Sequence, residues 1–427
     1  MANEDMIVGL DIGTTKVCVV IGERNQKGVI EITGVGVSPS AGMRRGVVVN
    51  IEATIKSIIE AVEAAEMMSG REIHVCWTGI GGSHIEGINS RGVVAISGQK
   101  RENREISKDD MYRVIEAARA VVIPLDRQII QTIPQCYIVD DHRGIKDPLG
   151  MIGVRLEAEV HIITSSATSA ENLLRCVNRA GFKASKSLLL LQVLAAGRAV
   201  LTPEEQELGV ALLDLGGGTT DVLVYVDGAP YSTFTIPVGG VEVTKDISTL
   251  KSISIEAAEK IKTESACCWE PLLEHDDDIL VSSMTGRPPV AIPRSHIYGI
   301  VRPRMEEVFD LVKQKLDCLN LPRPLSGGIV LTGGGASLIG AAELAAEIFK
   351  LPVRLGFPIR FANLGGLVNE YHDPGYATAI GLVLEGDKRE EEDVVERNPP
   401  PRQPIPGKKK IANPFARVKD WFKNGLF

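Results

Sequence analysis

The sequence has few aromatic residues, no excess of basic charge and no cysteine pattern, and the last two shortages count against particular classes of protein. Aromatic residues make up 4% of the 427 residues, and the net charge is −8. This mild acidity disfavours a nucleic-acid-binding protein, because such proteins are usually basic. The seven cysteines are odd in number and lack metal-ligand spacing, so we expect reduced, mostly buried thiols in a cytoplasmic protein.

Long hydrophobic runs are also missing. The most apolar stretch, residues 188–201, is short and interrupted by Gln192 and Arg198, so no membrane-spanning helix is expected. No basic segment precedes an apolar stretch at the N-terminus, which predicts no secretory signal. A chain of this length and ordinary composition is expected to fold into two or more domains with substantial cores.

Two stretches about two hundred residues apart share one pattern: an apolar strand, an aspartate, glycine with threonines, and another apolar strand. The first stretch is 7–21, with Asp11, and the second is 212–226, with Asp214. Either copy alone is a common hydrophobic hairpin, but two copies predict a duplicated domain whose halves clamp one nucleotide triphosphate. A carboxylate is unfavourable beside a bare phosphate and favourable beside one that carries Mg²⁺.

The first half of the chain has an interruption in its β-α pattern. A helix over 51–68, ended by Gly70, precedes a stretch from 84 to 156 with alternating strands and a helix capped by Ser107. This stretch contains no catalytic constellation, so we interpret it as an inserted subdomain for contact with another protein. The β-α pattern is expected to resume with a strand at 159–164.

Several single residues are candidates for a functional role. Gln192 ends a strand that points toward the expected phosphate site, where an uncharged amide would hold an attacking water. His161 is interpreted as a partly buried strand residue rather than a ligand. Glu259 and Lys262 share one helix face, which from spacing alone favours an ordinary surface ion pair.

The glycine run at 333–335 follows a buried strand and precedes a helix expected over 338–349. Glycines remove side chains where a flat group must lie against the backbone, and a helix N-terminus favours an anion. A later helix, 376–384, is rich in small residues, which predicts close packing against another helix.

The C-terminal stretch has a composition of its own. Residues 387–410 are charged and then proline-rich, which predicts a disordered linker. Residues 411–427 hold four of the aromatic residues within the last thirteen positions, which predicts an amphipathic helix. Its membrane-facing residues would be Phe415, Val418, Trp421, Phe422, Lys423 and Leu426. A helix docked on its own protein is the alternative, which the long spacer and the lysine run disfavour.

The charge of this tail sets the strength of the expected anchor. Residues 408–427 carry six basic residues and one acidic residue, a net charge of +5. Attraction to anionic lipids is therefore at most about 5 kcal/mol, and the shallow apolar contacts add a similar amount. A single tail should bind reversibly, whereas many tails on one polymer would bind firmly.

In this order, the motifs resemble the actin-like ATPase superfamily of actin, sugar kinases and DnaK-type chaperones. The resemblance covers about residues 6–386 and implies an α/β fold with two lobes, each with a ribonuclease H-like mixed sheet. It implies that 11–16 and 214–221 are the phosphate motifs and 330–337 the adenosine motif. Bound ATP with Mg²⁺ is implied, with Asp11 and Asp214 positioning the metal through water. The other implied nucleotide-binding residues are Gly13, Thr14, Thr15, Lys16, Gly216, Gly217, Gly218, Thr219, Thr220, Glu259, Lys262, Gly333, Gly334 and Gly335, and Gln192 matches the residue that orients water in actin.

Within this superfamily the chain is most similar to the bacterial FtsA family. The insertion stands where that family carries its subdomain 1C, which implies contacts with later division proteins. The turn at 286–289 and a helix start at 302–304 resemble subdomain 2B, the face that receives the tail of FtsZ, and Arg304 and Glu307 match positions implicated in that contact. The implied divisions are 1–83, 157–204 and 375–386 for subdomain 1A, 84–156 for 1C, 205–248 and 320–374 for 2A, and 249–319 for 2B.

The resemblance implies an ATP-binding scaffold that polymerises with itself on the inner face of the cytoplasmic membrane, at the division septum, and anchors FtsZ filaments. At most a weak ATPase activity is expected. The alternatives are a sugar kinase of the same superfamily, for which we assign no catalytic base, and a pilus-assembly or chaperone relative. A chaperone should carry a substrate domain after residue 386, where this chain has only a tail.

Overall fold

The computed structural model of the chain divides into two units, Met1–Asp387 and Lys388–Phe427, and the three large sheets all lie in the first unit. The residues described are 6–97, 105–273, 276–281, 290–358 and 364–397.

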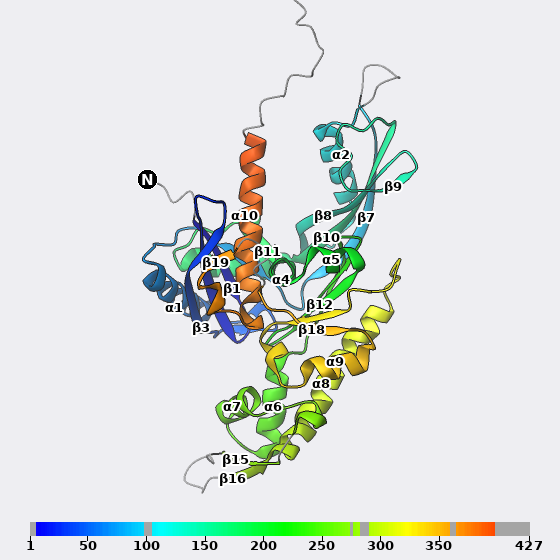
Figure 1. Ribbon diagram of the computed structural model, residues 1–427. Helices are drawn as coiled ribbons and strands as arrows, with labels where there is room; N and C mark the ends of the chain where they lie inside the picture. The colour runs from blue at the N-terminus through cyan, green and yellow to red at the C-terminus, as the bar shows by residue number, and fades with distance from the viewer. Residues whose placement is uncertain (1–5, 98–104, 274–275, 282–289, 359–363, 398–427) are drawn as a thin grey trace, which may run out of the picture. The chain divides into compact units, whose positions relative to one another are not determined.

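The first lobe is built around a six-stranded mixed sheet with the order β11-β6-β1-β2-β3-β19 (Figure 1). β1 pairs antiparallel with β2 and parallel with β6, and Asp11 lies opposite Cys18. Its strands are almost wholly buried because helices cover them: α1 packs on β3, and α10 packs on β1. The bounds are β1 (Met6–Ile12), β2 (Lys16–Arg24), β3 (Ile30–Pro39), β6 (Trp77–Ile80), β11 (Leu189–Leu191), β19 (Leu364–Gly366), α1 (Ile51–Ser69), α3 (Ala167–Arg179), α4 (Gln192–Val200) and α10 (Ala377–Arg397), with a short hairpin β4 (Met43–Arg44) and β5 (Val47–Val48).

The second lobe repeats this plan around a five-stranded sheet with the order β14-β13-β12-β17-β18. β12 pairs antiparallel with β13 and parallel with β17, and Asp214 lies opposite Asp221. Strand order and direction match those of β3-β2-β1-β6-β11, so the predicted actin-like duplication is confirmed. The bounds are α5 (Pro203–Leu208), β12 (Val210–Leu215), β13 (Thr220–Val226), β14 (Ala229–Ile236), α6 (Gly240–Lys251), α7 (Ile255–Glu264), β15 (Asp278–Val281), β16 (Val290–Pro293), α8 (Arg294–Asp317), β17 (Ile329–Thr332), α9 (Ala341–Phe349) and β18 (Val353–Leu355).

The apolar runs of β12 and β13 serve two hydrophobic cores. Leu212 and Leu223 belong to the core shared with the first lobe and α4, whereas Leu213 and Val222 belong to the core of the second lobe. Since side chains alternate across a strand, both faces of this hairpin are buried. This is why its sequence reads as a continuous apolar run instead of an alternating one.

The insertion folds as a separate four-stranded sheet, β7-β10-β8-β9, with one helix on it. The predicted strand at 159–164 exists, but its placement in the first lobe was wrong: it lies in β10, which pairs with β7 and β8 along most of its length. The insertion therefore extends about ten residues further than residue 156. The bounds are β7 (Glu86–Ala95), α2 (Lys108–Arg119), β8 (Arg127–Val139), β9 (His142–Ile145) and β10 (Arg155–Ser166).

Asp110 anchors the start of α2 inside this insertion. Its fully buried carboxylate accepts hydrogen bonds from Ser107 Oγ (2.6 Å), Ser107 N (3.0 Å) and Ser97 N (3.0 Å), and it pairs with Arg113. Although burial raises it, the pKa of Asp110 is held well below its usual range by these hydrogen bonds. Because the folded pKa is depressed, this stabilisation is present above the usual aspartate pKa near 4 and is lost as the pH falls further.

We expect Asp110→Ala to lower the free energy of unfolding of the insertion by about 3 kcal/mol, because several buried donors lose their acceptor. Hydrogen exchange of residues 155–166 at pH 7 measures this. The matched control is Asp109→Ala, an exposed neighbour that pairs with Arg113 at 3.4 Å and should cost less than about 1 kcal/mol. Equal exchange in the two variants would contradict the anchoring role.

Two predicted helix starts differ in the structure. The helix start expected at 302–304 was wrong, because α8 begins at Arg294 and contains Pro303. Burial of Ile297, Val301 and Met305 on one face holds the helix together across this proline. α9 begins at Ala341, because Gly340 in a left-handed conformation separates it from the 3₁₀ turn Gly334–Ser337, which starts within the glycine run.

The predicted linker is also partly helical. α10 continues to Arg397, so the first part of the stretch expected to be disordered is helix. Its glutamate, lysine and arginine residues have high helix propensity, which composition-based reasoning on disorder overlooked. The rest of the linker, the predicted helix at 411–427 and the turn at 286–289 lie outside the described residues.

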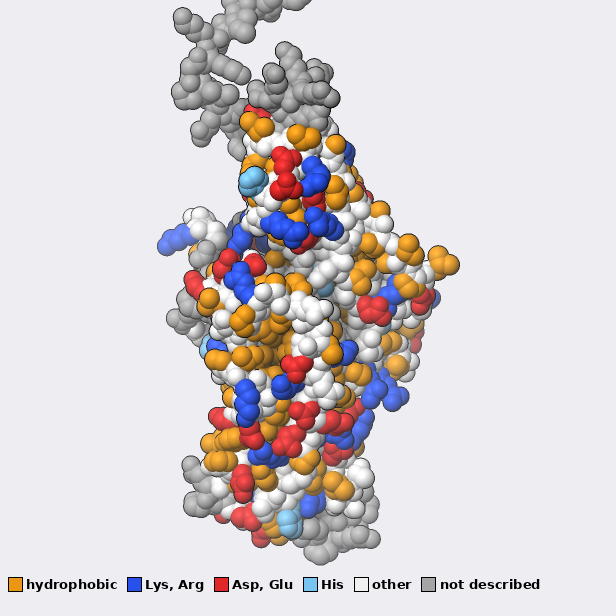
Figure 2. Space-filling model, turned by 90° about the vertical axis from the view of Figure 1, so that its right-hand side faces the viewer, with side chains coloured by type: hydrophobic (Ala, Val, Ile, Leu, Met, Phe, Trp, Pro, Cys, Tyr) orange, Lys and Arg blue, Asp and Glu red, His pale blue; other side chains and the backbone are white. Residues whose placement is uncertain are grey.

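On the face of the molecule shown in Figure 2, acidic and basic side chains are interspersed with apolar ones. All seven cysteines have free thiols, and only Cys318 and Cys136 are not buried. Among the described residues, no helix has the length and apolar character that crossing a bilayer requires.

Candidate functional site

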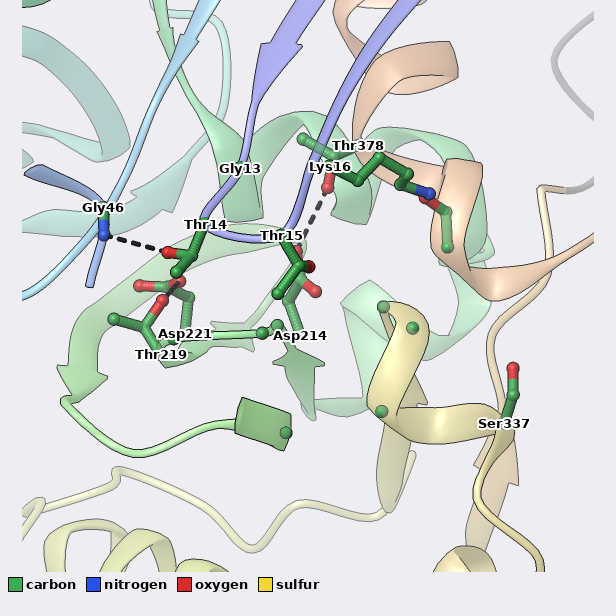
Figure 3. A pocket seen from close by; sticks show the side chains of 18 of the residues that line it. Gly13, Thr14, Thr15, Lys16, Gly46, Asp214, Thr219, Asp221, Ser337 and Thr378 are labelled. Carbon is green, nitrogen blue, oxygen red and sulfur yellow. Dashed lines mark hydrogen bonds between the residues drawn. The ribbon is translucent and has the colours of Figure 1, made fainter. Parts of the chain in front are cut away.

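The two aspartate-bearing hairpins, β1–β2 and β12–β13, meet across one cavity of about 360 Å³ (Figure 3). This cavity brings together every predicted nucleotide-site residue except Thr220. Those residues are Asp11, Gly13, Thr14, Thr15, Lys16, Gln192, Asp214, Gly216, Gly217, Gly218, Thr219, Glu259, Lys262, Gly333, Gly334 and Gly335. Residues that are far apart in the sequence thus line the same cavity, because they come from the two similar lobes on either side of it.

The turns at the two hairpins close in the same way. Gly13 N donates to the carbonyl of Lys16 at 2.9 Å, and Gly216 N donates to the carbonyl of Thr219 at 2.9 Å. A Cβ at Gly217 would lie 2.5 Å from Thr15, so glycine there lets the two turns approach each other. The result is a ring of backbone amides and hydroxyl groups, the chemistry that cradles an anion.

Two carboxylates, Asp11 and Asp214, enter the cavity from opposite lobes. Gln192 donates from Nε2 to Asp11 Oδ1 at 2.6 Å, and Thr378 donates from Oγ1 to Asp214 Oδ2 at 3.1 Å. Burial raises the pKa of Asp11 to about 6 and that of Asp214 to about 7. Paired buried carboxylates facing a cavity are the oxygen donors that Mg²⁺ favours, so these residues fit a magnesium ion.

The glycine run at 333–335 and a lysine–glutamate pair also line the cavity. Gly333 has a φ of 79°, and a Cβ there would overlap Asp214 Oδ1, so this position requires glycine; a Cβ at Gly334 would meet nothing within 4 Å. Lys262 Nζ contacts Glu259 Oε2 at 2.8 Å, and the pair lines the cavity. The ion pair favoured from spacing is therefore present, and it lies at the cleft.

Lys16 has two contacts besides the cavity that it lines. Its Nζ donates to the carbonyl of Gly375 at 2.6 Å and lies 4.4 Å from the centre of the Tyr376 ring. The ammonium group of Lys16 can therefore contact an anion in the cavity if it gives up its hydrogen bond with the carbonyl of Gly375.

The placement of Thr220 differs from the prediction. It is buried, its Oγ1 donates to the carbonyl of Val238 at 3.0 Å, and it does not line the cavity. The alternation of side chains along β13 instead turns Asp221 to the cavity side, where its carboxylate accepts from Thr219 Oγ1 at 2.9 Å. Sequence reasoning missed Asp221 as a site residue, although the two-residue alternation along the strand could have identified it.

The two residues of the predicted FtsZ contact lie together on α8, outside the cavity. Arg304 donates from Nε to Asp246 Oδ2 at 2.6 Å and also pairs with Glu307. The side chain of Glu307 is half exposed. Both are accessible in part, and Arg304 ties α8 to α6.

His161 is a buried strand residue, as interpreted. Its two ring nitrogens contact Asn89 and Thr233, and it lies in β10 of the insertion.

Comparison with protein-family models matches two segments of the chain. Residues 82–164 match the SHS2 domain inserted in FtsA, and residues 211–381 match the cell division protein FtsA. The cell division protein FtsA of Borreliella burgdorferi is 42% identical over 427 residues, 100% of each chain. The chain belongs to the FtsA family of cell division proteins. The FtsA of Pseudomonas aeruginosa is 42% identical over 89% of each chain, and that of Escherichia coli is 36% identical over 89% of this chain and 90% of the other.

Solved structures support the fold of this FtsA-family chain. A PilM–PilN type IV pilus biogenesis complex superposes with a TM-score of 0.62 at 17% identity, covering 89% of this chain and 98% of the other. MreB5 of Spiroplasma citri bound to ADP superposes with a TM-score of 0.52 at 15% identity, covering 93% of this chain and 99% of the other. These similarities show the actin-like fold alone. Family membership identifies an actin-like cell division protein rather than a sugar kinase, a pilus-assembly protein or a chaperone.

Proposed function

We propose that this FtsA-family protein binds ATP with Mg²⁺ between its lobes and polymerises on the inner face of the cytoplasmic membrane, where it anchors FtsZ filaments at the septum. The observation that carries the nucleotide site is the convergence of Asp11 and Asp214 on one cavity of about 360 Å³. The cavity supplies amide, hydroxyl and cationic donors for phosphates, together with a glycine-lined flank at 333–335 for the adenosine.

The roles of the residues follow from their positions. Asp11 and Asp214 would hold Mg²⁺ through its waters, and the ion would neutralise phosphate charge. The turns at 13–16 and 216–219 would bind the phosphates, and Glu259 and Lys262 would contact the adenosine. Gln192 already donates to Asp11, so hydrolysis would require its amide to turn toward a water. We therefore propose a nucleotide-dependent scaffold with at most weak ATPase activity.

Calorimetry tests the nucleotide site directly. We expect the full-length chain to bind ATP and ADP when magnesium is present. The affinity should fall when a chelator removes the magnesium, because the two carboxylates would then repel the phosphates. Absence of binding with magnesium would refute the proposed site.

The surface formed by Arg304 and Glu307 is the proposed contact for the FtsZ tail. Arg304 is a bidentate donor that could exchange Asp246 for a carboxylate of a partner. The inserted sheet is the proposed contact for later division proteins, because it carries no catalytic constellation.

The membrane contact is proposed for residues 411–427. We expect the full-length protein to float with vesicles that contain anionic lipid, and a chain ending at Arg397 to stay in the soluble fraction. The truncation keeps all of α10, so the folded unit should be unchanged. A further test is Trp421→Glu, which removes one apolar contact and adds a charge at the proposed bilayer face.

Two controls make the flotation result specific. Vesicles of neutral lipid should capture less protein, because they lack the attraction for the six basic residues of 408–427. Exchange of exposed Lys56 for glutamine should leave flotation unchanged, since this lysine lies on α1. Equal flotation of the full-length and truncated chains would refute the membrane assignment.

A further inference from the structure

The insertion is joined by the chain to the first lobe, and it also contacts β14 of the second lobe. Asn89 on β7 donates from Nδ2 to the carbonyl of Tyr231 at 3.0 Å, and Gln135 on β8 donates from Nε2 to the carbonyl of Pro230 at 2.9 Å. β7 and β14 approach closely: a Cβ at Gly87 on β7 would overlap Thr233 Oγ1 on β14. The position of the insertion therefore depends on β14 as well as on its own chain connections.

His161 lies at the centre of this contact, with 1% of its surface exposed. Nδ1 lies 2.7 Å from Asn89 Oδ1, and Nε2 lies 2.9 Å from Thr233 Oγ1. Because Asn89 uses its amide nitrogen for Tyr231, its oxygen accepts from Nδ1–H, and Nε2 accepts from the Thr233 hydroxyl. Burial lowers the pKa of His161 to about 4, so the ring is neutral at pH 7 and supplies the one donor and one acceptor required.

The same strand reaches the nucleotide cavity. Thr235 lies two residues beyond Thr233, so both side chains lie on one face of β14. Thr235 Oγ1 donates to Asp221 Oδ1 at 2.5 Å, and Asp221 Oδ2 accepts from Thr219 Oγ1 at 2.9 Å. Thr219 lines the cavity. Hydrogen bonds thus run from the phosphate turn to β14 and from β14 into the insertion.

We propose that this path, from Thr219 through Asp221 and β14 to His161, couples occupancy of the cavity to docking of the insertion on β14. The inference rests on the proposed nucleotide binding. A threonine hydroxyl has one hydrogen, so Thr219 donates either to Asp221 or to a phosphate oxygen. When a phosphate oxygen accepts this hydrogen, Asp221 loses one of its hydrogen-bond donors. The hydrogen bond between its carboxylate and Thr235 then changes, and the contact of β14 with the insertion loosens.

The coupling has a reciprocal consequence that can be measured. If nucleotide loosens the docked insertion, a variant with weakened docking must bind nucleotide more tightly, by the same factor. Thr233→Val removes the hydroxyl that donates a hydrogen bond to His161 Nε2, and it keeps the shape of the side chain. Thr233 does not line the cavity, so its substitution has no direct route to the nucleotide.

The experiment measures hydrogen exchange of residues 86–95 in the full-length protein, with and without Mg·ATP or a non-hydrolysable analogue, alongside calorimetry of nucleotide binding. In the wild type we expect nucleotide to speed exchange about tenfold. In Thr233→Val we expect fast exchange in both states and nucleotide binding up to about tenfold tighter. A purely structural role would speed exchange without changing affinity.

Two further variants serve as controls, and a third replaces Thr233→Val if needed. Thr132→Val is the matched control, because Thr132 Oγ1 is buried in the insertion without a hydrogen-bond partner. Thr233→Ser keeps the hydroxyl and should behave as the wild type. Should Thr233→Val fail to fold, Gly87→Ala separates β7 from β14 by its added Cβ and should give the same tighter binding.

The possible failures are distinct. If wild-type protein binds no nucleotide, the proposed function fails. If nucleotide binds but exchange of residues 86–95 is unchanged, or if Thr233→Val and Thr132→Val have equal affinities, the coupling is refuted while the nucleotide site stands.

Discussion

Asp214→Asn should weaken binding of Mg·ATP at least about 100-fold, the equivalent of about 3 kcal/mol. Asparagine keeps the shape of the side chain and its contact with Thr378, but it removes one of the two negative charges that would hold magnesium. The effect should depend on the metal: without magnesium, the variant should bind ATP no worse than the wild type, because a charge that repels phosphate has gone. Calorimetry with magnesium and with a chelator measures both values.

The control for this prediction is Asp310→Asn, an equal change of charge at an exposed position on α8. It should leave nucleotide affinity within a factor of about two, since exposed charges outside the cavity are screened by solvent. If Asp214→Asn binds Mg·ATP as tightly as the wild type, the two carboxylates do not form the metal site, and the central claim about the cavity fails.

Gly381→Val should destabilise the whole two-lobed unit by about 3 kcal/mol or more. Gly381 lies on α10 where it crosses α4, and any Cβ there would overlap the carbonyl oxygen of Ala195. The obstacle is backbone, so no side chain can rotate away, and the two helices must separate. Because α4 also contacts β12 and β13 of the second lobe, the separation should disturb the cavity too.

Thermal unfolding measured by circular dichroism checks this effect. The matched control is Gly299→Ala on α8, an exposed helical glycine whose added Cβ would meet nothing within 4 Å. It should be neutral or stabilising by up to about 1 kcal/mol, because alanine has the higher helix propensity. Similar melting temperatures for the Gly381 and Gly299 variants would show that α4 and α10 do not pack as described.

The hairpins could be predicted because their information is local. An apolar strand, an aspartate and a glycine turn specify β1–β2 and β12–β13 without help from the rest of the chain, and repetition of the pattern implied two equivalent lobes. Helix caps could also be predicted: Ser107 accepts from Asp110 N, and Gly70 ends α1 in a left-handed conformation. Each of these depends on a few neighbouring residues and on sterics within one turn.

The errors arose where distant parts of the chain decide the outcome. Pro303 suggested a helix start, but the core of the second lobe holds α8 intact through it. The strand around His161 could pair with either of two sheets, and its sequence carries no preference between them. Thr220 and Asp221 are adjacent and face opposite sides of β13, and the pairing of Asp221 with Asp214 on β12 places Asp221 on the cavity side.

The sequence by itself determined the duplicated acid-bearing turns, the insertion and the charge pattern of the tail, because short-range sterics and composition encode them. The tertiary structure decided that Asp11, Asp214 and Asp221 share one cavity, and that His161 joins the insertion to β14. Asp11 lies about two hundred positions from Asp214 and Asp221, and His161 lies 72 positions from Thr233. Such contacts form only when packed sheets have fixed their register, which no local pattern of residues can specify.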